Sequence, residues 1–105
     1  MPEVSKIIAA LRERLEVLYG GRLVQLVLFG SHARGDAEPG SDIDVLVVLH
    51  GDVNSGVEIK RTGGAVSELS LENDVVISCI FMDEYRYLHR NGPLLRNVRR
   101  EGIAA

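Results

Sequence analysis

Apolar and polar residues alternate along this chain with two different periods, and the periods predict helices and strands in turn. Apolar side chains recur every three or four positions over residues 3–19, so an amphipathic helix is expected there, ended by a pair of glycines. Residues 23–29 form a nearly continuous apolar run, which is typical of a buried strand. A short helix over residues 31–34 and a second strand over residues 41–49 are expected to follow.

The second half of the chain repeats this alternation with weaker signals. Residues 57–71 have a helical pattern, but a Gly-Gly pair in the middle could kink the helix or split it in two. Residues 74–82 alternate as a third strand, and a helix is expected to start near residue 83 with acidic residues in its first turn. Proline opens a last helix over residues 93–100. The alternation as a whole predicts an α/β fold.

Length and composition limit the functions that fit. The 105 residues are expected to form a single domain over residues 1–105, since no long linker divides them and the chain is too short for a separate substrate-binding domain. The net charge is −3, from 12 basic and 15 acidic side chains. The chain therefore lacks the overall cationic field of general nucleic-acid binders, and a nucleic acid is not expected as its direct substrate.

Targeting and metal-binding signals are sparse. The first residues have no signal-peptide pattern and no apolar run is long enough to cross a bilayer, so we expect a cytoplasmic protein without a membrane partner. Cys79 lies in an apolar strand pattern and is expected to be a buried thiol rather than a nucleophile. His32 is expected at the surface, and the spacing of the histidines does not favour a zinc site.

The most specific chemistry lies between residues 29 and 48. A tight glycine turn at Gly30-Ser31 is followed after ten residues by Asp42 and Asp44, which stand one residue apart at the start of an apolar run. Side chains alternate along a strand, so both carboxylates should point to one face, with their Cα atoms about 6–7 Å apart. Two such carboxylates can share divalent cations, and Mg²⁺ prefers oxygen ligands that leave room for phosphates.

This motif resembles the signature of the nucleotidyltransferase superfamily related to DNA polymerase beta, in its minimal, MNT-type branch. The residues that match are Gly30, Ser31, Arg34, Gly35, Ser41, Asp42 and Asp44, followed by the apolar strand over residues 45–49. The resemblance implies a small nucleotidyltransferase fold, with a mixed β-sheet of three or more strands flanked by α-helices. It also implies that Asp42 and Asp44 are catalytic metal ligands.

In the family that the motif resembles, a third carboxylate stands on the neighbouring strand. Asp74 is the best candidate for this catalytic and metal-binding role, Glu72 is its rival, and Asp83 fits less well. With three acids, two Mg²⁺ ions would neutralise the leaving group of ATP or another NTP and activate the attacking hydroxyl. Without metal, the clustered carboxylates repel one another, so at least one pKa should rise.

Four further residues are candidates for binding the nucleotide. At Gly30 a turn without a side chain lets backbone N–H groups approach phosphates, and the Ser31 hydroxyl can add a donor or cap a helix. Arg34 either reaches triphosphate oxygens or fixes the loop by pairing with Asp36, Glu38 or a backbone carbonyl. For Ser41, a loop-capping hydroxyl is favoured over a direct chemical role.

Three functions remain open at this level. The resemblance favours an enzyme that transfers AMP or another NMP to a hydroxyl of a separate HEPN-domain toxin, and so acts as its antitoxin. The alternatives are a weakly catalytic or non-catalytic antitoxin that binds a nucleotide or the HEPN partner, and a nucleotidyltransferase for small molecules such as aminoglycosides. Homo-oligomers stay open. The C-terminal arginines form either a solvated face or a docking surface; they are Arg86, Arg90, Arg96, Arg99 and Arg100.

Overall fold

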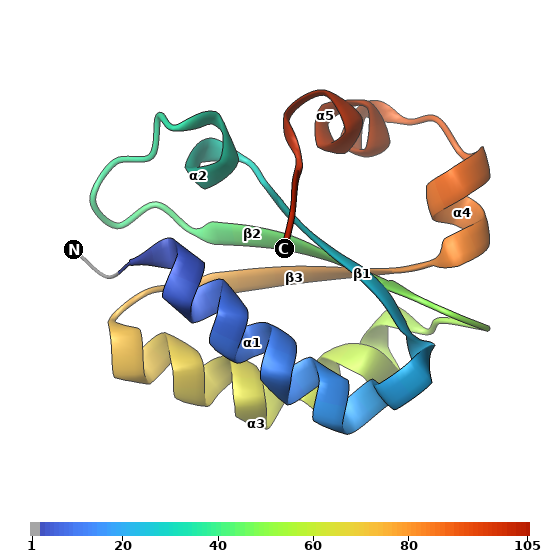
Figure 1. Ribbon diagram of the computed structural model, residues 1–105, viewed down its shortest axis with the longest axis horizontal. Coiled ribbons are helices and arrows are strands. Elements are labelled where there is room, and N and C mark those ends of the chain that lie inside the picture. Colours follow the sequence, from blue (N-terminus) through green and yellow to red (C-terminus); the bar gives the residue numbers. More distant parts are fainter. Residues whose placement is uncertain (1–2) are drawn as a thin grey trace.

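The structure is a computed structural model that describes residues 3–105 (Figure 1). Its helices and strands follow the expected alternation. In chain order they are α1 (Val4–Tyr19), the 3-10 turn η1 (Gly20–Arg22), β1 (Leu23–Phe29), α2 (Ser31–Arg34), β2 (Ile43–Leu49), α3 (Ser55–Asn73), β3 (Ile77–Asp83), α4 (Glu84–His89), α5 (Pro93–Glu101) and β4 (Ile103–Ala104).

The strands form one mixed sheet, which confirms the expected fold class. The sheet has four strands in the order β3-β2-β1-β4. Strand β1 is antiparallel to both β2 and β4, whereas β2 and β3 are parallel and are joined by the crossover helix α3. In this register Asp44 lies across from Phe29 on one side and across from Ser78 on the other.

Helices cover both faces of the sheet (Figure 1). Helices α1 and α3 lie on one face, and α2, α4 and α5 lie on the other. A separate apolar cluster fills each face, because alternate side chains of the central strands point to opposite sides. Every residue of β2 is buried except Asp44, which is only partly buried. The core therefore holds this strand firmly and leaves one carboxylate near its beginning.

Several boundaries differ from the predicted ones. Helix α3 runs without interruption through the glycine pair at 63–64, because its packing against α1 and β3 outweighs the poor helix propensity of glycine. The expectation that Asp74 opens the third strand is wrong. Asp74 ends α3 in a left-handed conformation, φ 51°, and its N–H donates to the carbonyls of Ser70 and Leu71. The short strand β4 had no recognisable pattern in the sequence.

Within residues 3–105 no helix is both long and apolar enough to span a lipid bilayer.

Candidate functional site

The site is built around the turn that connects β1 to α2. Gly30 has φ 77°, a conformation that glycine adopts readily and other residues avoid. The pairing of β1 with β2 places Asp44 beside this turn. A methyl group on Gly30 would overlap the Oδ2 atom of Asp44. The missing side chain therefore has a specific purpose, which is to let a carboxylate lie directly against the backbone of the turn.

Charge accumulates around Asp44. Its pKa is raised, first by burial and then by the negative charge of Asp42, while His32 and Arg34 act in the opposite direction. The rise that was expected for clustered carboxylates is therefore found at Asp44. Asp42 itself is exposed and lies just before β2. A divalent cation fits here, because two hard oxygen ligands of like charge lie close together and the turn leaves them uncovered by any side chain of residue 30.

The structure does not bring Asp74 to this pair. It lies at the end of α3, and it lines a cavity of about 1060 Å³ together with Ser41 and other residues of the loop over residues 35–41. The residue across from Asp44 on β3 is Ser78. Among residues 3–105, no three Asp, Glu, His or Cys side chains converge to hold a metal ion. The described residues thus offer two carboxylates for one cation and no third acid for a second.

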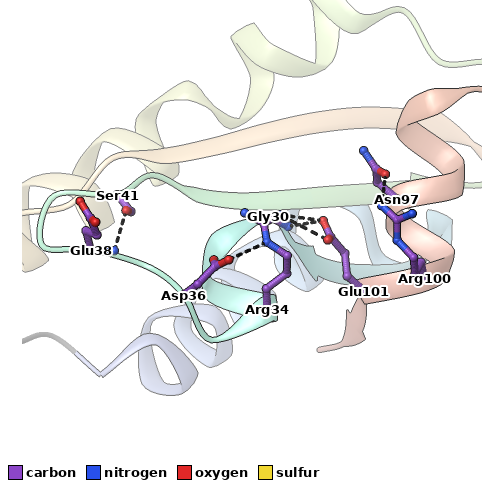
Figure 2. A network of polar contacts seen from close by, with 8 residues as sticks. All are labelled: Gly30, Arg34, Asp36, Glu38, Ser41, Asn97, Arg100 and Glu101. Carbon is purple, nitrogen blue, oxygen red and sulfur yellow. Dashed lines mark hydrogen bonds and ion pairs between the residues drawn. The ribbon is translucent and has the colours of Figure 1, made fainter.

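Hydrogen bonds shape the loop between α2 and β2. The hydroxyl of Ser41 accepts from the backbone N–H of Glu38 at 2.9 Å, so Ser41 acts as the expected loop cap (Figure 2). The Nε2 atom of His32 lies 3.1 Å from the carbonyl oxygen of Ser41. His32 is therefore partly buried rather than fully exposed as expected. Ser31 is the first residue of α2, where backbone N–H groups lack a partner within the helix.

Arg34 is held by two carboxylates (Figure 2). Its Nε donates to Asp36 at 3.1 Å, and its Nη1 donates to both oxygens of Glu101, at 3.2 and 3.3 Å. These hydrogen bonds raise its pKa, with Asp36 contributing most. The contact with Asp36 confirms one alternative for Arg34. Glu101 was missed, because nothing in the local sequence shows that the end of the last helix returns to this turn.

The remaining candidates take structural roles. Arg99 donates to Asn91 and to backbone carbonyls near the end of α4, and Arg100 donates to Asn97. These bonds fit a solvated face with local contacts. Burial raises the pKa of Cys79 to about 11, which keeps its thiol protonated and unreactive at neutral pH.

The structure combines a mixed sheet with a glycine turn that lies against the carboxylate of Asp44. The family of the nucleotidyltransferase domain matches residues 4–103. The chain belongs to this family.

Individual relatives agree with this assignment. The chain is 39% identical over 89 residues to a protein of Methanocaldococcus jannaschii named "Putative protein adenylyltransferase MJ0604", and the match covers 84% of this chain and 83% of that protein. A Sulfolobus solfataricus crystal structure named "putative nucleotidyltransferase" has a TM-score of 0.65 at 25% identity, covering 94% of this chain and 76% of the other. A crystal structure of a toxin–antitoxin with AMP-PNP shares the fold, with a TM-score of 0.63 at 21% identity, covering 95% and 69%.

Proposed function

We propose that this nucleotidyltransferase is magnesium-dependent and transfers AMP, or another NMP, from a nucleoside triphosphate to a hydroxyl group of a partner protein. The observation that carries the proposal is the carboxylate of Asp44, which lies against the Gly30 turn with the charge of Asp42 beside it. Carboxylates that are partly desolvated and lack balancing cations are costly to the fold, and they are typical of sites that bind a cation and its ligand.

Each part of the site has a task in this reaction. Asp42 and Asp44 would hold the cation, which when bound neutralises charge on the leaving pyrophosphate. Gly30 and Ser31 would admit the phosphates to the turn, and Arg34 would balance their charge. The acceptor hydroxyl attacks the α-phosphorus, the bond to the bridging oxygen breaks, and the hydroxyl proton must pass to a base. Ser78, across from Asp44, has no basic group.

We further propose that the acceptor is a toxin partner of the HEPN type, so that the protein acts as an antitoxin. The relative named as a protein adenylyltransferase supports a protein acceptor, and the toxin–antitoxin structure with AMP-PNP supports the context and the nucleotide.

A second function has one specific observation in its favour. With Ser78 at the position facing Asp44, the residues that the structure describes bring no third carboxylate to this pair to activate the acceptor. This favours an antitoxin that binds the nucleotide and its partner tightly and turns over weakly.

One experiment separates the two functions. Purified protein is incubated with ATP, Mg²⁺ and the product of the neighbouring reading frame, and both proteins are weighed by mass spectrometry. A mass gain of one AMP on the neighbouring protein supports transfer if the gain disappears with the D42N and D44N variants. The control is D52N, which removes an exposed acid far from the turn and should leave the mass gain unchanged. A stable complex without the mass gain, retained in D42N and D44N, supports the binding function. If the experiment gives neither a stable complex nor a mass gain, both functions are disproved.

A further inference from the structure

Glu101 connects the end of the chain to the glycine turn. It is the last residue of α5, and its Oε1 atom accepts from the backbone N–H of Gly30 at 3.2 Å. The same carboxylate accepts from Nη1 of Arg34 (Figure 2). Its side chain is only 12% exposed. One carboxylate therefore fixes both the backbone of the turn and the guanidinium of Arg34 beside it.

The C-terminal segment does not depend on Glu101 for its attachment. Strand β4 pairs with β1, the N–H of Ala105 donates to the carbonyl of Leu26 at 2.9 Å, and the guanidinium of Arg12 donates to the carbonyl of Ala105. At Gly102, a side chain would overlap the carbonyl oxygen of Val98. The backbone on both sides of Glu101 is thus held by other contacts. Its carboxylate is free to serve the turn.

The arrangement also determines which donors of Arg34 remain. Asp36 accepts from Nε of Arg34, and Glu101 accepts from Nη1. The Nη2 group has no hydrogen-bond partner among residues 3–105, so it is left to bind an anion. Arg34 also lies close enough to Asp44 for its charge to lower the pKa of that carboxyl group. An arginine without the two restraints could instead turn toward Asp42 and Asp44 and neutralise the carboxylates that the cation needs.

We propose that Glu101 is a positioning residue for the triphosphate. It fixes the Gly30 turn through a backbone N–H and keeps Arg34 on the phosphate side of the turn rather than on the metal-binding pair. This inference rests on the proposed function, because it assumes that a triphosphate binds at this turn. It assigns a role in nucleotide binding to a residue that lies 71 positions after Gly30 in the sequence.

The test compares graded changes at one position. E101A removes both contacts, whereas E101Q keeps an acceptor for the Gly30 N–H and loses the charge that holds Arg34. R12A is the matched control, because it loosens the C-terminal segment and leaves the turn untouched. Binding of AMP-PNP with Mg²⁺ and of adenosine is measured by calorimetry, and the amide signal of Gly30 is followed by NMR in the same variants.

The expected result is a graded loss for the phosphate-bearing ligand only. E101A should weaken AMP-PNP binding roughly 10- to 100-fold, E101Q less, and R12A not measurably, since a hydrogen bond to a charged group contributes on this scale. Adenosine binding should not change, and the Gly30 amide signal should shift most in E101A. Unchanged or tighter binding of AMP-PNP in E101A, or an equal loss in R12A, overturns the inference and leaves the proposed function intact. If the wild-type protein binds no AMP-PNP, the proposed function on which this inference rests is disproved.

Discussion

Two polar clusters lie toward opposite ends of β2, one near the start of β1, which pairs with Leu49, and one at the turn after β1, beside Asp44; they differ in how their charges are balanced. At one end, the hydroxyl of Tyr19 donates to Oε1 of Glu58 at 2.8 Å, and Glu58 is only 3% exposed. The guanidinium of Arg61 lies 3.4 Å from the same oxygen. Burial, followed by the hydrogen bond to Glu58, raises the pKa of Tyr19. This cluster is closed, since each polar group has a partner.

At the other end, acids outnumber bases around the glycine turn. The guanidinium of Arg34 pairs with Asp36 and Glu101, and the carboxylates of Asp42 and Asp44 add two further negative charges near the turn. Burial and a neighbouring like charge raise the pKa of Asp44. Balanced polar groups in the interior therefore stabilise the fold. An exposed excess of negative charge instead favours the binding of a positively charged ligand.

The largest expected effect is the loss of transfer in D44N. Removing the charge that faces the turn should lower the transfer rate about 1,000-fold, because the cation loses its central ligand. Single-turnover assays with ATP and Mg²⁺ measure this rate, and D52N serves as control. Transfer by D44N at the wild-type rate would show that the cluster at the turn is not catalytic.

A change in the closed cluster should lower stability and leave nucleotide binding unchanged. E58A leaves the buried hydroxyl of Tyr19 without its partner, so the free energy of unfolding should fall by about 2–3 kcal/mol. The midpoint of thermal unfolding should drop by roughly 10–15 °C. Calorimetry measures both, and AMP-PNP affinity of the folded variant should equal that of the wild type. E58Q, which keeps an acceptor for Tyr19, should lose less; an equal loss would contradict the role given to this bond.

A smaller, positive effect is expected from adding an acid to the open cluster. S78D places a carboxylate across from Asp44, where it can accept the proton of the attacking hydroxyl. Transfer should rise about tenfold or more, since general-base catalysis contributes at least this much. S78N has a similar size without the basic group and should not accelerate the reaction. A gain in both variants would mean that the shape of residue 78 matters rather than its charge.

The smallest effect concerns stability without metal. Because the pKa of Asp44 is raised in the folded state, its ionised form costs stability at neutral pH, and the cost fades as the pH falls and the group takes up its proton. D44N should therefore melt a few degrees higher than the wild type at neutral pH without Mg²⁺. The difference should shrink at acidic pH and after Mg²⁺ is added to the wild type. An advantage that is independent of pH would contradict this origin.

The sequence described the glycine turn and β2 well, but not which residue of β3 lies across from Asp44, and the reason is physical. The turn at Gly30 and the strand that carries Asp44 follow each other within twenty residues, so local pattern and spacing describe them well. The position of Ser78 depends on the register between β2 and β3, which packing of the whole core determines. An error of three residues in the start of β3 was enough to favour Asp74.

Glu101 illustrates a second limit. A glutamate before a glycine at the end of a basic helix has the pattern of an ordinary helix terminus. Its role arises only when β4 returns the chain to β1 and brings α5 over the turn, and a strand of two residues carries no periodic signal. Whole elements were predictable, whereas contacts between distant elements were not.

The burial of β2 has a consequence for how such a protein can vary. If this strand slid by one position against its neighbours, the side chains of its two faces would change places, and its aspartate would enter the apolar cluster that packs against α1 and α3. The packing of the core therefore also fixes the orientation of the carboxylate. Any substitution that preserves the packing preserves this orientation. Mutational drift in the interior can then proceed without disturbing the chemistry at the surface.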